Sequence, residues 1–285
     1  MFTGRLFPDR ADFPIDSIIL AQVRSTFSLL VLAPILLLQR GLVSLNLSAQ
    51  DFGRCILLGV LGVAASNYFY YLAIQKTNVA TAIVLQYTAP IWVLLFLVAR
   101  GRQRPTAQRV ISVALAVVGS ALAIGAIGGS NFRINPAGIV AAFLAAFSFA
   151  FYNLAGHSLL AHHDRWKVLL YVLVGSALCW IVINPPWKIV AANYSGDQWV
   201  FLLIFAVTSA LIPFSLYFAG LQHLDATRAV VTSSLEPVFS ILIAAVALGE
   251  GIRPIQALGI AIVLMATILV QLRAVDAKSR TAPEY

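Results

Sequence analysis

Residues 226–248 read ATRAVVTSSLEPVFSILIAAVAL, an apolar run interrupted near its middle by Glu236 and Pro237. A helix of this length can cross the hydrocarbon core of a bilayer. Glu236 then lies about ten residues into the helix, at a depth of about 15 Å. A charged side chain at that depth costs about 2.5–3.5 kcal/mol on insertion scales, so we expect Glu236 to face the interior of a helix bundle.

The composition places the whole chain in the membrane class. Of the 285 residues, 60% are hydrophobic and only 11% are charged, whereas soluble domains are about 25% charged. The mean hydropathy is +0.90. Because the apolar runs are uniform rather than alternating, they predict helices and not the strands of a barrel. The fold class is therefore an all-α integral membrane protein.

Nine apolar runs predict a bundle of nine transmembrane helices. Their expected ranges are 15–38, 55–74, 79–99, 110–127, 136–160, 166–184, 199–219, 226–248 and 255–272. The connecting loops are short, so helices that follow one another in the chain are expected to be antiparallel neighbours.

The net charge of +8 comes from Lys and Arg in these short loops, which indicates membrane topology rather than nucleic-acid binding. Twelve basic residues fall on the side of the C-terminus and six on the other side. Cytoplasmic loops carry the excess of Lys and Arg. We therefore expect a multi-pass protein of the inner (plasma) membrane, with the C-terminus cytoplasmic and the N-terminus of this chain outside.

The two halves of the chain resemble each other. YLAIQ at 71–75 aligns with FAGLQ at 218–222, and without gaps Pro90 then meets Pro237. The two copies start on opposite faces of the membrane by the predicted helix count. This pattern is an inverted-topology repeat, and transporters with this architecture place their site at the interface between the repeats.

The motifs SLEPVF at 234–239, ALGE at 247–250 and QALG at 256–259, with a weaker copy QYTAP at 86–90, resemble the EamA-like branch of the drug/metabolite transporter superfamily. Arg24, early in the first predicted helix, also fits this resemblance. The resemblance covers roughly residues 15–272. It implies a carrier that exports small metabolites, often amino acids, and the neutral and aromatic amino-acid exporters are the most similar branch.

The family pattern is five helices plus five, whereas this chain shows four plus five. The expected segments are a polar N-terminal stub (1–14), a first repeat of four helices (15–127), a second repeat of five (136–272) and a cytoplasmic tail (273–285). The first helix of the first repeat is missing from this sequence. Either an upstream segment supplies it, or the protein is a nine-span variant.

Glu236 and Arg24 are the two charged residues expected near the middle of the membrane. The functional interpretation is that Glu236 binds a substrate ammonium group or a coupling proton, and that Arg24 binds a substrate carboxylate. The alternative is that the two side chains pair with each other, directly or through water, and stabilise the bundle.

Further candidates for substrate contacts are polar or aromatic residues on four predicted helices. They are Gln86, Tyr87, Asn67, Tyr71, Tyr152 and Ser233. Each of them could instead serve packing between helices. Pro90 and Pro237 each remove a backbone hydrogen bond and are expected to kink their helices near the site.

These features favour a secondary carrier that works by alternating access, and not an enzyme. A proton-coupled drug or cation efflux carrier is the alternative within the same class. A membrane-embedded lipid-modifying enzyme would need His, Asp or Ser clustered at the lipid–water boundary, and only His157, His162 and His163 approach that description. A scaffold without transport is attractive only if the first helix is truly absent.

We expect no cofactor and no metal. No Walker A loop is present, so ATP is not the direct driver, and the three histidines lack the ligand spacing of a metal site. The expected partners are a small-molecule substrate and the lipid bilayer, not nucleic acid. A second copy of the chain, in a homodimer, is a further candidate partner.

Overall fold

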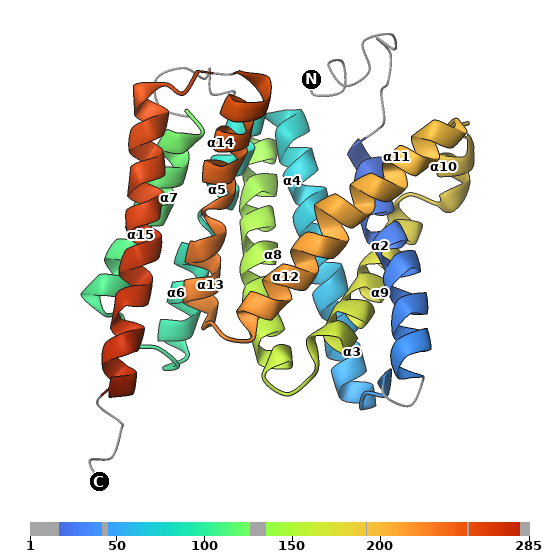
Figure 1. The fold of residues 1–285 in the computed structure, drawn as a ribbon, viewed down its shortest axis with the longest axis horizontal. Helices are drawn as coiled ribbons and strands as arrows, with labels where there is room; N and C mark the ends of the chain where they lie inside the picture. Colours follow the sequence, from blue (N-terminus) through green and yellow to red (C-terminus); the bar gives the residue numbers. More distant parts are fainter. Residues whose placement is uncertain (1–16, 42–44, 126–134, 192, 250, 280–285) are drawn as a thin grey trace.

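The computed structural model of the chain describes residues 17–41, 45–125, 135–191, 193–249 and 251–279. All regular secondary structure in these residues is helical, and the helices form one bundle (Figure 1). In chain order the elements are α2 (Ser17–Arg40), α3 (Ala49–Leu57), the π-helix η2 (Leu58–Ala64), α4 (Ala65–Lys76), α5 (Val79–Gln86), α6 (Ala89–Ala99), α7 (Ala107–Ala123), α8 (Pro136–Leu160), α9 (Arg165–Ile183), α10 (Pro186–Ala191), α11 (Gly196–Ala206), the π-helix η3 (Val207–Leu211), α12 (Ile212–Leu221), α13 (Ala226–Ser233), α14 (Glu236–Leu248) and α15 (Pro254–Ser279).

Eight helical segments in the described part of the chain are long and apolar enough to cross a membrane. A further apolar helix, α7, has 17 residues and falls just short of them. The prediction of an all-α membrane protein is therefore confirmed, and the count of nine spans is approximate.

Helix ends differ from the predicted ones where a capping residue extends a helix into polar sequence. The second span is predicted to begin at Cys55, but α3 begins at Ala49. Ser48 Oγ accepts a hydrogen bond from the backbone N–H of Asp51 at 3.1 Å and so satisfies one of the free donors at the helix start. Asp51 and Arg54 lower the local hydropathy, which hides this first turn from a search for apolar runs. The short helix α10 was not among the predicted elements.

Two spans are interrupted near their middles, at equivalent places in the two halves. α5 ends at Gln86 and α6 begins at Ala89, with Pro90 in its first turn. α13 ends at Ser233 and α14 begins at Glu236, with Pro237 in its first turn. A proline in the first turn of a helix needs no N–H partner, so each proline starts a new half-helix inside the membrane.

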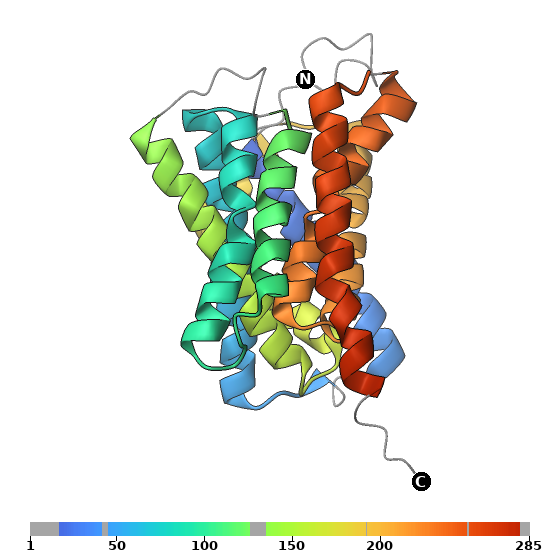
Figure 2. The same cartoon turned by 90° about the vertical axis from the view of Figure 1, so that its left-hand side faces the viewer.

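A second kind of interruption also occurs once in each half. The π-helix η2 joins α3 to α4, and the π-helix η3 joins α11 to α12. The order α2, α3–η2–α4, α5–α6, α7 thus has the same local features as the order α9, α11–η3–α12, α13–α14, α15. α7 and α15, the last helices of the two series, lie side by side (Figure 2).

Small residues let the helices approach closely in the part of the bundle formed by η2, α2 and α9. A Cβ atom added to Gly59 of η2 would lie 2.1 Å from the backbone oxygen of Val172 on α9. Ser25 and Ser176 share a hydrogen bond of 2.8 Å between α2 and α9. Such contacts between small and polar residues are what holds helices together in lipid, where burial of apolar surface gives no preference for protein over lipid.

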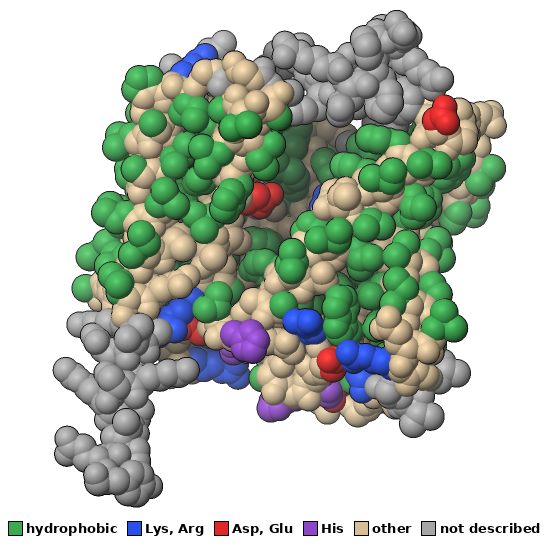
Figure 3. Space-filling model, viewed as in Figure 1, with side chains coloured by type: hydrophobic (Ala, Val, Ile, Leu, Met, Phe, Trp, Pro, Cys, Tyr) green, Lys and Arg blue, Asp and Glu red, His purple; other side chains and the backbone are tan. Residues whose placement is uncertain are grey.

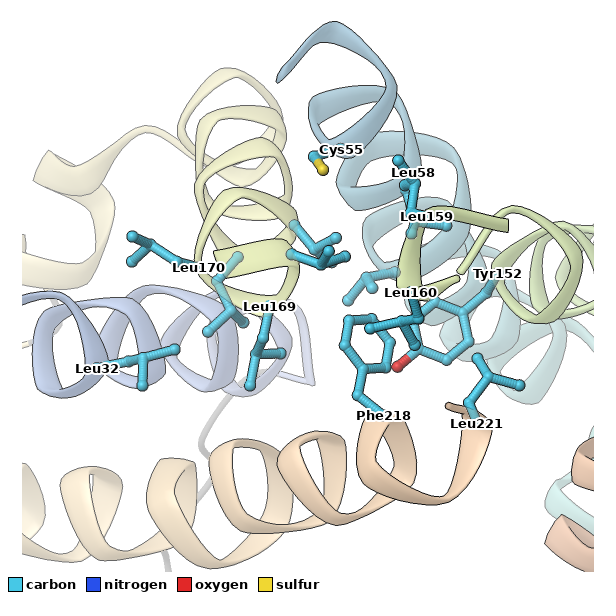
Figure 4. Close-up of a cluster of buried hydrophobic side chains, with 14 of the residues drawn as sticks. Leu32, Cys55, Leu58, Tyr152, Leu159, Leu160, Leu169, Leu170, Phe218 and Leu221 are labelled. Atoms are coloured by element: carbon cyan, nitrogen blue, oxygen red, sulfur yellow. The ribbon is translucent and has the colours of Figure 1, made fainter. Parts of the chain in front are cut away.

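The largest apolar cluster lies where α2, α3, η2, α8, α9 and α12 meet (Figure 4). Leu58, Leu169 and Phe218 are almost completely buried there. The cavity described next adjoins this cluster, because Phe149 of α8 packs against the cluster and also lines the cavity.

Candidate functional site

A cavity of about 380 Å³ lies between the two interrupted spans and the neighbouring helices. Its wall comes from both halves of the chain, with residues from α2, α4, α5, α7, α8, α14 and α15. Figure 3 shows the molecule hollowed on this face, with an acidic side chain at mid-height between α14 and α12. The lining residues are Arg24, Asn67, Tyr70, Tyr71, Ile83, Gln86, Tyr87, Ala123, Ile124, Phe149, Glu236, Pro237, Ser240, Ile241 and Gln256.

Glu236 is the first residue of α14 and projects into this cavity. Its Oε2 accepts a hydrogen bond from the hydroxyl of Tyr87 at 3.0 Å. Tyr87 directly follows the last residue of α5 in the first half. The carboxylate is exposed to the cavity, and Tyr87 is the only described residue that hydrogen-bonds to it. A carboxylate in the first turn of a helix is also favoured by the helix dipole.

Arg24 of α2 lines the same cavity and is held by η3. Its Nη2 donates a hydrogen bond of 2.7 Å to the backbone oxygen of Ser209, inside the π-helical turn. The Nε of Arg24 has no hydrogen-bond partner among the described residues. No ion pair joins Arg24 to Glu236 within 4.0 Å in the described structure, so the two charges occupy one cavity without direct contact.

Three amide side chains, those of Asn67, Gln86 and Gln256, line the cavity wall. Asn67 donates to the backbone oxygen of Val63 in η2 at 2.9 Å. The side chain of Gln86 makes no hydrogen bond to any described residue, and its position at the end of α5 places it next to Tyr87. The cavity therefore combines the carboxylate of Glu236, the guanidinium of Arg24, the unpartnered amide of Gln86 and several tyrosine rings.

Six of the eight predicted substrate contacts line the cavity, and two do not. Tyr152 lies instead in the apolar cluster of Figure 4, where its ring stacks on Phe218 with 5.5 Å between centroids. Ser233 donates to the backbone oxygen of Val230 at 2.8 Å within its own helix.

Tyr70 and Gln256 line the cavity but are missing from the predicted set. Tyr70 lies between the predicted residues Asn67 and Tyr71 in an aromatic run, and the sequence does not show which faces of α4 meet the cavity. Gln256 belongs to the QALG motif at 256–259, which carried the family resemblance and could have drawn attention to it.

In the described part of the chain, no group of three or more His, Cys, Asp and Glu side chains could hold a metal ion.

The comparisons with known proteins agree with this architecture. The model of the EamA-like transporter family matches residues 10–125 and 136–272. The chain is 24% identical, over 78% of its length and 74% of the relative, to the "Uncharacterized inner membrane transporter YicL" of Salmonella typhimurium. It is 29% identical, over 73% of its length and 68% of the relative, to the "Threonine/homoserine exporter RhtA" of the same organism.

A solved structure described only as "Crystal structure of protein" has the same fold. It superposes with a TM-score of 0.74 at 22% sequence identity, and the match covers 93% of this chain and 90% of that chain.

Proposed function

Since the chain belongs to the EamA-like transporter family and is therefore a multi-pass inner-membrane transporter, we propose that it is a secondary carrier that exports neutral amino acids, aromatic ones included, or their derivatives. Residues 15–127 and 136–272 form its two halves in this proposal, and alternating access between them moves the substrate. The observation that carries the proposal is the cavity with Glu236 and Arg24 on different helices and no ion pair between them.

Zwitterionic substrates match these two charges. Glu236 binds the ammonium group, with one of its oxygens free of protein partners, and Arg24 binds the carboxylate through its guanidinium group. Gln86, Tyr87, Asn67 and Tyr71 supply hydrogen bonds and aromatic surface. A neutral amino acid therefore leaves few buried polar groups without a partner, which is the main requirement for binding in a closed site.

The size of the cavity favours small metabolites over drugs. Its volume of about 380 Å³ is near the lower end of the range of about 300–1,000 Å³ for ligand pockets. The name of the exporter relative from Salmonella typhimurium, which refers to threonine and homoserine, supports the same substrate class.

In this proposal the described conformation is open towards the outside. The cavity includes Ile124 at the end of α7 and Gln256 near the start of α15, so it extends towards the end of the bundle that the charge distribution predicts to be outside. At the opposite end Thr227 of α13 donates to Gln103 Oε1 at 2.9 Å, which connects the second half to the loop between α6 and α7.

The test is counterflow of labelled amino acids in proteoliposomes that contain the purified protein or its Glu236→Gln variant. We expect saturable exchange by the wild type and a loss of about tenfold or more in the variant, because a hydrogen bond to a charged group contributes about 1.5–3 kcal/mol. Asp197→Asn is the matched control, since it changes an exposed carboxylate at the start of α11 to an amide.

Absence of amino-acid exchange by folded protein would overturn the proposal. Uptake of a cationic dye that follows an imposed pH gradient, with no amino-acid exchange, would replace it with proton-coupled drug efflux.

A further inference from the structure

A second and larger cavity lies between α6 and α8, away from the charged site. It has a volume of about 930 Å³, and its floor contains Leu97, Ala150 and Ala226, which are buried. α6 crosses α8 in this region (Figure 2). We call this cavity the α6–α8 groove; its other lining residues are Trp92, Leu95, Phe96, Ala99, Arg102, Gln103, Phe147, Phe151, Leu154, Ala155, His157, Ser158 and Asp225.

The groove is open on the outer surface of the bundle. Leu95, Phe96 and Phe147 line it and are 55%, 41% and 46% exposed. In a membrane-spanning chain such side chains face lipid, so lipid tails have direct access to the groove. Its apolar end contains the contact between the rings of Trp92 and Phe147, whose centroids are 4.3 Å apart.

The length of the groove matches one leaflet of a bilayer. Phe147 and Ser158, both on α8, mark its two ends and stand eleven residues apart. This separation corresponds to about 16 Å along the helix, and half of a hydrocarbon core of about 30 Å is about 15 Å.

The polar end of the groove carries positive charge that no carboxylate neutralises. Arg102 lines this end, and Arg100 and Arg104 lie in the same loop. Among the described residues, no carboxylate forms an ion pair with any of these three arginines. The one acidic residue of the groove, Asp225, is itself paired with Arg228 at 3.3 Å and with Arg109 at 4.0 Å.

We propose that the α6–α8 groove binds one anionic phospholipid from the leaflet next to the 100–104 loop. An acyl chain lies along Phe151, Leu154 and Leu95 towards Trp92. The phosphate lies at the polar end, where Arg100 and Arg102 supply charge and Ser158 supplies a hydroxyl. Basic pockets between transmembrane helices are a known mode of recognition for acidic lipid headgroups, and here the apolar groove supplies the site for the tail.

Native mass spectrometry of the whole protein in detergent tests this proposal. Phosphatidylglycerol is compared with phosphatidylcholine of the same acyl chains, and glycerol 3-phosphate serves as the headgroup without a tail. We expect retained phosphatidylglycerol adducts, weak phosphatidylcholine adducts, and none with glycerol 3-phosphate. In the Arg100→Gln/Arg102→Gln variant the affinity for phosphatidylglycerol should fall about fivefold for each arginine removed.

The matched control is Arg165→Gln/Lys167→Gln, which removes two cations at the start of α9, outside the groove. It should leave phosphatidylglycerol binding unchanged. An equal loss in both double variants would overturn the proposal, because it would mean that net charge alone attracts the lipid. Equal binding of the two phospholipids would overturn it as well.

Brominated acyl chains supply a readout of position. Phosphatidylglycerol with brominated tails should quench part of the tryptophan fluorescence of the wild type, and this part should be lost in Trp92→Phe. Quenching that is unchanged in Trp92→Phe would place the tail elsewhere. Cross-links between two copies through cysteines introduced at positions 95 and 147 would show that a second copy occupies the groove, and would also overturn the proposal.

Discussion

The hydroxyl of Tyr87 donates to Glu236 Oε2 across 3.0 Å and thereby joins the two interrupted spans, one from each half of the chain. Both residues stand at the same kind of place, the break between two half-helices in the membrane. If the halves move relative to each other during transport, this hydrogen bond lies in the wall of the cavity, at the junction between the moving parts.

Tyr87→Phe should reduce transport without unfolding the protein. The substitution keeps the ring and removes the hydroxyl that orients the carboxylate. We expect the ratio of maximal rate to KM for amino-acid exchange to fall about tenfold, the lower part of the range for a hydrogen bond to a charged group. Tyr68→Phe is the control, because Tyr68 packs on Trp180 rather than lining the cavity. Equal exchange kinetics in Tyr87→Phe and wild-type proteoliposomes would show that the hydroxyl has no role in binding.

Arg24 is predicted to have a structural role as well as a binding role. Arg24→Gln shortens the side chain, so the carbonyl of Ser209, which now accepts from Nη2 at 2.7 Å, loses its partner inside the bundle. A buried acceptor without a partner costs about 1–3 kcal/mol. We therefore expect a lower Tm in detergent for Arg24→Gln, together with reduced exchange.

Glu236→Gln supplies the contrast to that experiment. The side chain at position 236 is exposed to the cavity, and the glutamine oxygen can still accept a hydrogen bond from Tyr87. The Tm of this variant should therefore stay close to that of the wild type while exchange is lost. A Tm that falls equally in Glu236→Gln and Arg24→Gln would favour a purely structural role for both residues.

Thr227→Val should make it easier for the end of the bundle that contains the 100–104 loop to open. Thr227 is completely buried and donates to Gln103 at 2.9 Å, and valine has the same shape without the hydroxyl. Loss of a hydrogen bond that contributes about 1 kcal/mol would change the ratio of two conformations about fivefold. Spin labels at positions 104 and 224 should then show a larger population of long distances. Thr208→Val is the control, since the hydroxyl of Thr208 bonds only within its own helix; equal distance distributions in the two variants would contradict the prediction.

The sequence predicts the spans well because a helix needs only a run of about 20 apolar residues to cross the bilayer, and such a run is visible in the sequence. The range 79–99 has the same ends as α5 and α6 together, and Pro90 indicates where this span is interrupted. The π-helices are different, because a wider turn depends on what lies beside it. In η3 the carbonyl of Ser209 accepts from Arg24, which is 185 residues away in the chain, and no local pattern encodes that contact.

The same reasoning explains which site residues could be found from the sequence. Asn67 and Tyr71 were identified because they share one face of a helix and a polar face in the membrane must point inward. Tyr152 has the same local appearance, but α8 packs that residue against α12 and not against the cavity. The choice between two polar-aromatic faces thus depends on the neighbouring helix, which the sequence of α8 alone does not specify.

Gly59 provides a test of how closely η2 and α9 must pack. In Gly59→Ala the new Cβ atom would lie 2.1 Å from the backbone oxygen of Val172 and 2.8 Å from the backbone nitrogen of Ser176. Because both neighbours are backbone atoms, no side-chain rotation relieves the overlap, and the helices must separate. We expect a loss of about 1–3 kcal/mol of stability, the usual cost of overpacking, seen as a lower Tm in detergent.

Gly53→Ala is the matched control for this substitution. It lies in α3, six residues before Gly59 in the same span, and an added Cβ would meet nothing within 4 Å. Alanine is favoured over glycine inside a helix by about 0.5–1 kcal/mol, so this variant should melt at the same temperature as the wild type or slightly higher. A Gly59→Ala protein as stable as Gly53→Ala would mean that η2 and α9 are farther apart than the structure places them.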